Sequence, residues 1–328
     1  MHALVTGATG FIGFPLTNEL VKKGHKVRCL VRNASNLKEL KKLDVELVFG
    51  DIEKKETLKS AVKNIDTVYH LAGGGNVTAT FKKGYQKLKK LNVDAVENLL
   101  EECIKAKVKN FILFSSISAM GIIIEKKLDE ETKPEPLTPH EICKYESELL
   151  IEKYKNKINF TILRPGIVYG PRGINSEILL LCKLIKKGIL PIPGNGDNLM
   201  PFIYVNDLVK ATLLISENKS TRYETYIIVS ENEPTFNQIA KTIKKYLNPK
   251  AKLLHVPRKM VIFSSSFMEK IGNLFDFEPM FNQRRAISMT SNRIYDTSKL
   301  KRLIKSQQTE LNEGLKESIE WYKEKKLI

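Results

Sequence analysis

The sequence predicts an α/β protein in which a doubly wound parallel sheet is followed by a smaller C-terminal α+β lobe. Two observations support this prediction. Apolar runs suited to buried strands alternate with helical patterns along the first half of the 328-residue chain, and a glycine-rich turn joins the first strand to the first helix. Because strand–helix–strand units connect through right-handed crossovers, this alternation produces parallel pairing with helices on both faces of the sheet.

The individual elements follow from hydrophobic periodicity. The first strand is the apolar run that ends at Thr6. Further strands are expected at 26–32, 45–51, 66–72, 110–116 and 160–164. Helices are expected at 14–23, 36–42, 54–63, 84–106, 140–155 and 310–324. In such a sheet, ligands bind at the edge formed by the carboxyl ends of the strands.

The composition excludes several classes of protein. Its 42% hydrophobic and 28% charged residues are those of an ordinary soluble globular domain. No run of about eighteen apolar residues could span a membrane, and the opening core strand leads us to expect no signal peptide. The four cysteines are far apart without a Cys-x-x-Cys pair, so we expect no zinc site or disulfide framework and a cytoplasmic location.

The formal net charge of +17 raises the question of a polyanionic partner. The lysines are spread along the predicted helices, for example at 82–90 and 323–326, instead of forming one block. We therefore interpret these lysines as residues on solvent-exposed faces of helices and expect no nucleic-acid partner. The same charge would attract an anionic substrate or an acidic membrane surface, so peripheral membrane contact stays open.

The glycine-rich turn predicts a dinucleotide site. Gly7 allows a tight turn, Gly10 lets the backbone approach a diphosphate, and Gly13 lets the helix pack closely on the strand. The N-terminus of that helix presents free N–H groups and a partial positive charge to the phosphates. We therefore predict a Rossmann-type NAD(P)-binding domain over residues 1–165. Turn-rich segments follow, so residues 166–328 should form mainly a substrate-binding lobe, with about 200–215 returning to the first domain.

Several motifs, in the same order, resemble the extended short-chain dehydrogenase/reductases, which include the NAD-dependent epimerases/dehydratases and the dihydroflavonol-reductase-like enzymes. The motifs are Thr6–Gly13, Gly50–Ile52, His70–Gly73, Asn92–Val93, Arg164–Pro171 and Phe202–Leu208, and the resemblance covers nearly the whole chain. It implies that a nicotinamide coenzyme is held by Thr6, Gly7, Thr9, Gly10, Phe11, Ile12, Gly13, Asp51, Ile52, Leu71, Ala72, Gly73, Asn92, Lys144, Pro165 and Ile167. It further implies a homodimer through the helices 84–106 and 140–155.

The end of the second predicted strand bears on the choice of coenzyme. A ribose 2′-hydroxyl is usually held by an acidic residue there, and a 2′-phosphate by an arginine. This strand ends Val31-Arg32-Asn33 without a carboxylate, and Arg32 could pair bidentately with a phosphate. The sequence therefore favours NADP(H) over NAD(H); the alternative is that Arg32 is only a solvated strand-end residue.

The resemblance also implies a catalytic Ser or Thr, a Tyr, and a Lys four residues after the Tyr. Ser116 would hydrogen-bond the substrate oxygen and Lys144 would hold the nicotinamide ribose. The position four before Lys144 is His140, not tyrosine. Tyr145 cannot replace it, because one step along a helix rotates a side chain by about 100°.

His140 leaves two interpretations open. An imidazole has an unperturbed pKa of about 6.5 and exchanges protons near neutrality. Lys144 and an oxidised nicotinamide would disfavour its cationic form, which makes it a better base for alcohol oxidation than acid for carbonyl reduction. In the other interpretation His140 only begins the helix and has no catalytic part.

The leading hypothesis is an NAD(P)-dependent oxidoreductase that transfers hydride between the nicotinamide and an alcohol or carbonyl substrate, apolar or anionic. Epimerisation or dehydration of a nucleotide sugar is a further alternative. From a different class, the chain could be an NADP(H)-binding sensor or assembly subunit with little catalysis, because His140 replaces the tyrosine. A largely apolar helix expected at 260–275 is ordinary core, the lining of a hydrophobic pocket, or a surface for a membrane or partner.

Overall fold

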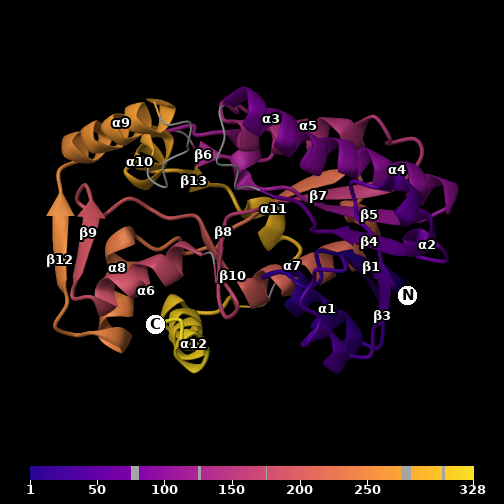
Figure 1. Cartoon of the computed structure of the whole chain (residues 1–328), viewed down its shortest axis with the longest axis horizontal. Helices are drawn as coiled ribbons and strands as arrows, with labels where there is room; N and C mark the ends of the chain where they lie inside the picture. The colour runs from indigo at the N-terminus through magenta and orange to yellow at the C-terminus, as the bar shows by residue number, and fades with distance from the viewer. Residues whose placement is uncertain (75–80, 125–126, 175, 275–281, 305–306) are drawn as a thin grey trace.

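A seven-stranded parallel sheet of order β11-β7-β5-β4-β1-β2-β3 forms the centre of a computed structural model of the chain (Figure 1). The structure describes residues 1–74, 81–124, 127–174, 176–274, 282–304 and 307–328. The strands of the sheet are β1 (His2–Thr6), β2 (Lys26–Val31), β3 (Glu46–Phe49), β4 (Thr67–His70), β5 (Asn110–Phe114), β7 (Asn159–Pro165) and β11 (Glu224–Ile228). β1 lies between β2 and β4, so the strand order reverses there, and the predicted doubly wound sheet is confirmed.

Two helix layers cover the sheet because alternate strand residues enter two separate cores. In β1, Leu4 packs into one core, whereas Ala3 and Val5 pack into the other. The first layer consists of α2 (Leu58–Val62), α3 (Phe81–Lys89), α4 (Ala95–Lys105) and α5 (Pro139–Glu152). The second contains α1 (Gly13–Lys22) and α7 (Val205–Glu217). Figure 1 shows these layers on opposite sides of the sheet.

Two predicted helices differ from the structure. The expected helix 84–106 contains a π-helical segment, η3 (Lys90–Asp94), between α3 and α4. The helix expected at 36–42 is wrong, because only a short 3₁₀ segment, η1 (Leu40–Lys42), forms. Ser35 Oγ accepts from the Arg32 amide and Asn36 Oδ1 from the Lys38 amide. Such local side-chain bonds compete with helix formation.

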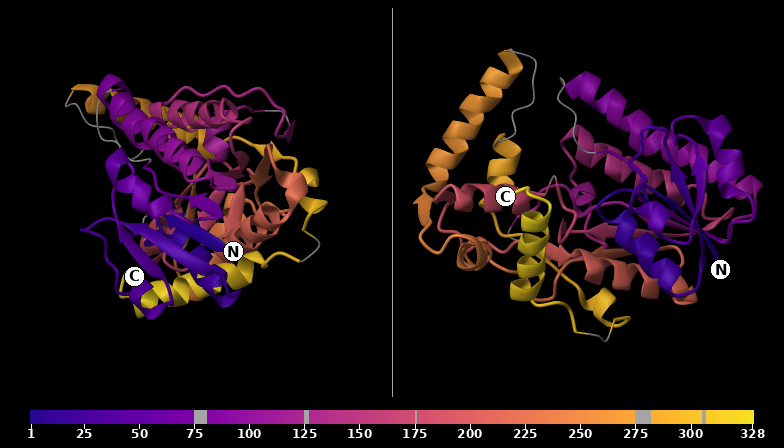
Figure 2. Two further views of the ribbon diagram at one scale, coloured as in Figure 1. Left: turned by 90° about the vertical axis from the view of Figure 1, so that its right-hand side faces the viewer. Right: turned by 60° about the horizontal axis from the view of Figure 1, so that its bottom comes forward.

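The remaining elements form a smaller part of the molecule with its own core. Here α8 (Phe236–Leu247) packs between α6 (Glu177–Lys186) and α12 (Leu311–Glu324), and α6 and α8 contact β9 (Ile189–Pro193), which pairs in parallel with β12 (Lys252–Val256). The predicted apolar helix is α9 (Arg258–Leu274), while residue 275 lies outside the described residues. α9 and α10 (Gln283–Met289) lie side by side at the end of the molecule away from the large sheet (Figure 2).

The second half of the chain also contributes to the large sheet. α7, which overlaps the predicted returning segment 200–215, lies against α1 and β7. β11, which the sequence pattern does not single out, pairs in parallel with β7. Short parallel pairs join β8 (Ile167–Tyr169) to β10 (Phe202–Tyr204) and β6 (Lys127–Leu128) to β13 (Ile294–Tyr295). No helix in the described part of the chain combines the length and the apolar character needed to cross a membrane.

Candidate active site

The glycine turn after β1 brings backbone segments so close that larger residues would not fit. A Cβ on Gly13 would lie 2.1 Å from the Gly7 carbonyl oxygen, and one on Gly7 would lie 2.9 Å from the Ala72 nitrogen. The Gly10 amide donates to the Gly7 carbonyl at 2.9 Å and closes the turn. α1 begins at Gly13, and a helix leaves its first N–H groups without acceptors inside the helix. This cradle fits a diphosphate.

The outer side of the same turn is open to solvent. Thr9, Phe11 and Ile12 are half-buried and Gly10 is exposed. A ligand could therefore reach the backbone of the turn from the carboxyl edge of the sheet.

Thr6 ties the turn to the loop after β4. Its Oγ1 accepts hydrogen bonds from the Leu71 and Ala72 amides at 3.2 and 3.1 Å, and lies 2.9 Å from Nδ1 of His70. Because both amides donate to Oγ1, we assign the hydroxyl proton to the bond with His70. Burial lowers the pKa of His70 to about 3, so its imidazole stays neutral. His70 therefore helps to position the backbone that follows β4, at the carboxyl edge of the sheet.

The residues expected near the adenosine lie at the carboxyl ends of β2 and β3. Arg32 follows β2 and is exposed. Asp51 follows β3, and its Oδ1 accepts from the Glu53 amide at 3.1 Å, while Ile52 is buried. Since β2 is next to β1, these residues share an edge of the sheet with the glycine turn.

Asn92 lies in the π-helical segment between α3 and α4. Its side chain donates to the carbonyls of Gly74 and Leu88, both at 3.0 Å, and accepts from the Gly74 amide at 3.3 Å. A Cβ on Gly73 would lie 2.8 Å from Asn92 Oδ1 and 3.9 Å from Lys144 Nζ. Asn92 thus fixes the loop after β4 beside the lysine. Single π-helical turns are frequent at functional sites.

Lys144 reaches the strand edge from α5. Its Nζ donates to the Phe114 carbonyl at 3.2 Å, at the end of β5, and lies near Gly73, just beyond the end of β4. Burial lowers the pKa of Lys144 to about 8, although the Glu148 carboxylate opposes this shift. The ammonium therefore lies in the gap between two adjacent strand ends.

A buried ion pair holds α5 in place. Arg164 of β7 makes a bidentate contact with Glu148, with its Nη2 2.7 Å from Oε2, and the Ser115 hydroxyl donates to Glu148 Oε1. Both charged side chains are almost fully buried. Ser115 and Arg164 are site-supporting residues that the sequence analysis did not assign, although Arg164 belongs to the Arg-Pro-Gly motif it identified.

His140 lies one helical turn before Lys144, on the same face of α5. Burial and, to a smaller extent, the nearby Lys144 lower the pKa of His140 to about 4, against the opposing effect of Glu141. Within the described residues, its Nδ1 is buried without a hydrogen-bond partner. The imidazole is thus neutral and has an unused ring nitrogen. Tyr145 is half-buried on another side of the helix, within electrostatic range of Arg164.

Ser116 follows β5 in extended conformation and begins a short 3₁₀ turn, η4 (Ile117–Met120). Its Oγ accepts from the Ser118 amide at 3.1 Å, which leaves its proton for another acceptor. Pro165 ends β7, and the next residue is pressed against β10: a Cβ on Gly166 would lie 2.2 Å from the Pro201 carbonyl oxygen. Ile167 then donates to the same carbonyl at 2.7 Å.

Three arginines of the smaller part lie near the starts of α5 and α6. Arg284 of α10 pairs with Glu141 at 2.8 Å, so this helix is fixed next to His140. Arg285 and Arg293 lie within electrostatic range of Glu177, at the start of α6. The sequence pattern does not predict these contacts; the adjacent pair Arg284-Arg285 is the one local signal for them.

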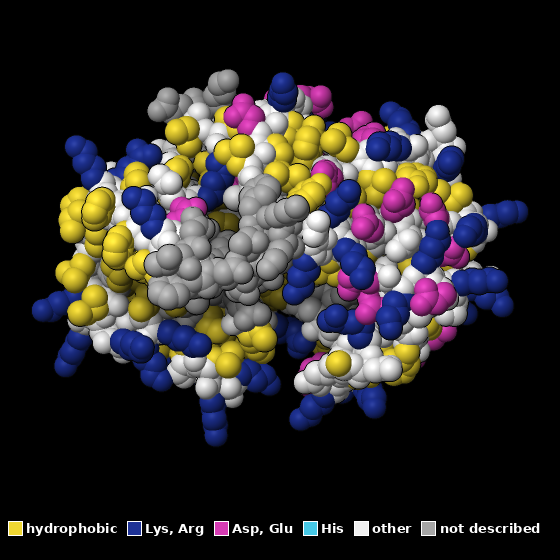
Figure 3. Space-filling view, turned by 45° about the horizontal axis from the view of Figure 1, so that its top comes forward, with side chains coloured by type: hydrophobic (Ala, Val, Ile, Leu, Met, Phe, Trp, Pro, Cys, Tyr) yellow, Lys and Arg dark blue, Asp and Glu magenta, His cyan; other side chains and the backbone are white. Residues whose placement is uncertain are grey.

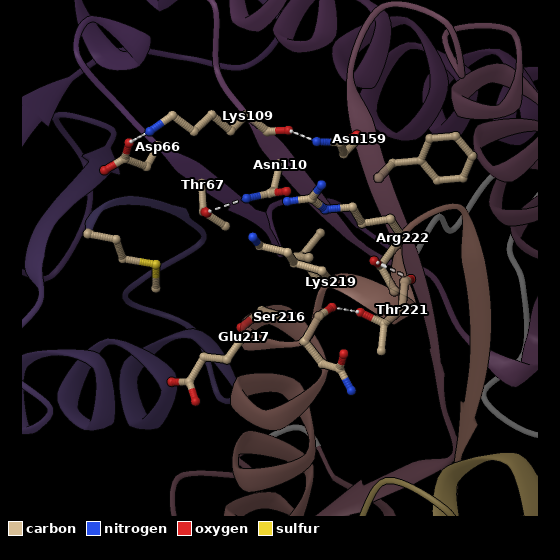
Figure 4. Close-up of a pocket in the computed structure, with 15 residues that line it drawn as sticks. Asp66, Thr67, Lys109, Asn110, Asn159, Ser216, Glu217, Lys219, Thr221 and Arg222 are labelled. Carbon is tan, nitrogen blue, oxygen red and sulfur yellow. Dashed lines mark hydrogen bonds and ion pairs between the residues drawn. The ribbon is translucent and has the colours of Figure 1, made fainter.

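The open hollow drawn in Figure 4 lies elsewhere. It measures about 330 Å³ and is lined by residues at the amino ends of the strands, including Asp66, Asn110 and Asn159. In open α/β sheets ligands bind outside the carboxyl ends, so the hollow is not the candidate site. Among the described residues, no cluster of His, Cys, Asp and Glu could hold a metal ion.

Comparison with known proteins gives a consistent result. The family described as "NAD dependent epimerase/dehydratase family" matches residues 3–228. Sterol demethylase protein B of Methylococcus capsulatus is 25% identical and aligns over 100% of both chains. The UDP-N-acetyl-alpha-D-glucosaminuronate decarboxylase of Bacillus cytotoxicus is 28% identical over 98% of each. The structure of UDP-glucuronic acid 4-epimerase from Bacillus cereus, in complex with UDP-glucuronic acid and NAD, has a TM-score of 0.79 at 25% identity, and the alignment covers 99% of both chains.

Proposed function

This chain belongs to the NAD-dependent epimerase/dehydratase family of enzymes, and on that premise we propose that it moves a hydride between a nicotinamide coenzyme and a secondary-alcohol or ketone carbon. One observation carries the proposal. Lys144 and a neutral His140 share one face of α5, and the lysine reaches the carboxyl ends of β4 and β5. These strand ends adjoin the diphosphate cradle at the end of β1.

Three side chains have separate roles in this proposal. Ser116 donates its free hydroxyl proton to the substrate oxygen and orients it. Lys144 holds the coenzyme ribose through its ammonium group. A ring nitrogen of His140 takes the proton from the substrate hydroxyl as the carbon loses its hydride. When bound, the nicotinamide accepts or returns that hydride.

The state of His140 favours a redox-neutral cycle. A neutral imidazole can accept a proton, but with a pKa of about 4 it holds the added proton weakly, and few molecules are cationic at neutral pH. A net reduction that begins with proton donation is therefore disfavoured. In an epimerisation, the proton taken in the first half-reaction is still present for the second. This supports epimerase-type chemistry over one-way carbonyl reduction.

We propose that the substrate is a nucleotide-linked sugar. The relatives named above include enzymes of UDP-linked sugars. Arg284, which pairs with Glu141, and Arg285 and Arg293, which lie near Glu177, give the smaller part positive charge that suits the diphosphate of such a substrate. An apolar alcohol is the alternative.

The test uses purified protein with UDP-glucose, UDP-glucuronic acid and a panel of cyclic secondary alcohols, with products followed by chromatography. We expect epimer formation from a nucleotide sugar and a loss of about 10²–10⁴-fold in kcat for His140→Ala. Ser116→Ala should also lower kcat, whereas His255→Ala, at an exposed histidine far from α5, should not.

Coenzyme affinity is measured separately by fluorescence titration. If the wild type and His140→Tyr bind the coenzyme tightly but convert no substrate of either class, the chain is better described as a coenzyme-binding sensor or assembly subunit, and the proposal of hydride transfer is wrong. If only the apolar alcohols react, the nucleotide-sugar assignment is wrong but hydride transfer stands.

We further propose that the preferred coenzyme is NADP(H). Arg32 is exposed at the end of β2, where a 2′-phosphate would lie, and no carboxylate follows it in the strand end. Arg32→Ala should weaken NADPH binding at least tenfold and leave NADH binding within about twofold. Equal losses for both coenzymes, or tighter NADH binding by the wild type, would contradict this assignment.

We also propose a homodimer that pairs the α3–α4 and α5 helices of two copies. Leu149, in the last turn of α5, is 46% exposed, and contact with a second copy would remove this apolar side chain from water. Leu149→Arg should convert a dimer to a monomer in light scattering. Leu214→Arg, at a position of α7 that is 41% exposed, is the control.

A further inference from the structure

The helix α9 exposes an apolar stripe. Met260 is 61%, Phe263 77% and Phe267 58% exposed, and Met268 is 40% exposed. The spacing of three and four residues places Met260, Phe263 and Phe267 on one face. The opposite face is packed inward, since Val261 is 5% and Ser265 0% exposed. α9 therefore lies on the molecule with its apolar side outward.

The neighbouring strand pair extends this surface. In β9 and β12, Ile189 is 50% and Leu254 47% exposed, whereas Leu190 and Ile192 point inward. Ile189 pairs with Lys252, and Pro191 pairs with Leu254, so the outward residues of both strands share one face. Figure 3 shows hydrophobic side chains gathered at this end of the molecule, with Lys and Arg projecting around them. Single exposed apolar residues are ordinary, but contiguous patches mark interaction sites.

Cationic side chains border the apolar surface. Arg258, Lys259 and Lys270 of α9 are exposed, as are Lys186, Lys187 and Lys252 near the strand pair. Lys259 and Lys270 flank the apolar stripe on the same side of the helix. The only carboxylate of α9 is Glu269, and it accepts a hydrogen bond from the Gln283 amide. The chain as a whole carries a net charge of +17.

We propose that α9 together with the β9–β12 pair is a docking surface for an anionic phospholipid bilayer. In this arrangement Met260, Phe263 and Phe267 enter the boundary between headgroups and acyl chains, as the apolar face of an interfacial helix does. Lys259 and Lys270 meet anionic headgroups. The charge pattern selects this occupant over a neutral protein partner, because Lys259 and Lys270 flank the apolar stripe and form no ion pair with an acid among the described residues. The proposal does not depend on the enzyme's substrate.

The test is co-sedimentation of the full chain with vesicles of phosphatidylcholine alone and with added phosphatidylglycerol. We expect binding that needs the anionic lipid and weakens as salt rises, because surface charge attraction is screened. The double variant Phe263→Ser/Phe267→Ser should lose most of the binding. The double variant Lys259→Glu/Lys270→Glu should lower the affinity about tenfold or more.

Two control variants distinguish vesicle binding through this surface from nonspecific binding through other exposed apolar or basic residues. Leu214→Ser removes an exposed leucine of α7, and Lys59→Glu reverses an exposed lysine of α2; both should bind vesicles like the wild type. Circular dichroism and coenzyme titration check that each variant is folded. The proposal is overturned if the wild type ignores the anionic lipid, or if the α9 variants bind as well as the controls. It is also overturned if Phe263→Ser/Phe267→Ser abolishes self-association in light scattering and the two controls do not. That result would make the surface an interface between copies of the chain.

Discussion

His140 and Lys144 are both shifted away from their charged states by burial, with different consequences. The pKa of His140 falls to about 4, far below neutrality, so the imidazole is neutral and one of its ring nitrogens can accept a proton. The pKa of Lys144 falls only to about 8, because the Glu148 carboxylate opposes the shift, so the ammonium keeps its charge at neutral pH. One turn of α5 therefore presents a proton acceptor and a fixed cation side by side.

This pair predicts the pH dependence of the proposed reaction. The kcat/KM for alcohol oxidation should rise as His140 loses its proton near pH 4 and fall as Lys144 loses its own near pH 8. Between these limits the profile should be flat. Replacing the Glu148–Arg164 pair by Gln and Met removes the carboxylate that supports the lysine's charge, so the alkaline limb should move to lower pH. An alkaline limb that stays in place in this double variant would show that Lys144 is not the group titrating there.

The free-energy cost of disrupting the buried Glu148–Arg164 ion pair depends on whether one charged partner remains buried. Arg164→Met leaves Glu148 buried with only the Ser115 hydroxyl as a side-chain partner. Breaking a buried pair in this way costs about 3–5 kcal/mol, whereas replacing both partners is often nearly neutral. We therefore expect a large loss of unfolding free energy in urea for Arg164→Met, and substantial recovery for Glu148→Gln/Arg164→Met. Equal destabilisation of the single and double variants would contradict this account.

At the scale of elements, the start of α5 is the most tightly specified. Thr138 caps the helix, with its Oγ1 accepting from the Glu141 amide at 3.3 Å, and Glu141 Oε2 accepts from the Thr138 and Leu137 amides. Pro139 takes the first position, where its missing N–H has no consequence. These residues fix the position of the first turn of α5, which contains His140.

A matched pair of cap variants tests this role. α8 begins with the same arrangement, in which Thr235 caps the helix and Gln238 returns the bond. Thr138→Ala and Thr235→Ala should each lose about 1 kcal/mol of unfolding free energy, as removal of an N-cap does. Only Thr138→Ala should also lower kcat, because it loosens the turn that holds His140. If both variants, or neither, change kcat, the cap of α5 does not position the catalytic turn.

For the whole molecule, the sequence predicts those features that depend on local pattern. The positions of β1 to β5 and β7 along the chain, the glycine turn and the shared face of His140 and Lys144 all follow from local sequence pattern. β11 could not be predicted, because its place beside β7 depends on a return of the chain from the smaller part. The contact between Arg284 and Glu141 joins residues 143 positions apart, and no periodicity carries such information. The helix predicted at 36–42 does not form, which shows that hydrogen bonds of the Ser35 and Asn36 side chains outweigh a helical pattern of apolar residues.

The buried histidines also make the stability of the whole fold depend on pH. Burial holds the pKa of His70 at about 3 and that of His140 at about 4, whereas both would titrate near 6.5 in the unfolded chain. Between these values the unfolded state binds more protons than the native state, so unfolding free energy falls as pH decreases below 6.5. From pH 7 to pH 5 the loss is about 2 kcal/mol for each histidine whose pKa is lowered this far. Urea unfolding of His140→Tyr should show a weaker decline over this range than the wild type, and His255→Asn, at an exposed position, should match the wild type. Parallel pH profiles for all three proteins would mean that His140 is protonated in the native state, and its role as a neutral base would then be untenable.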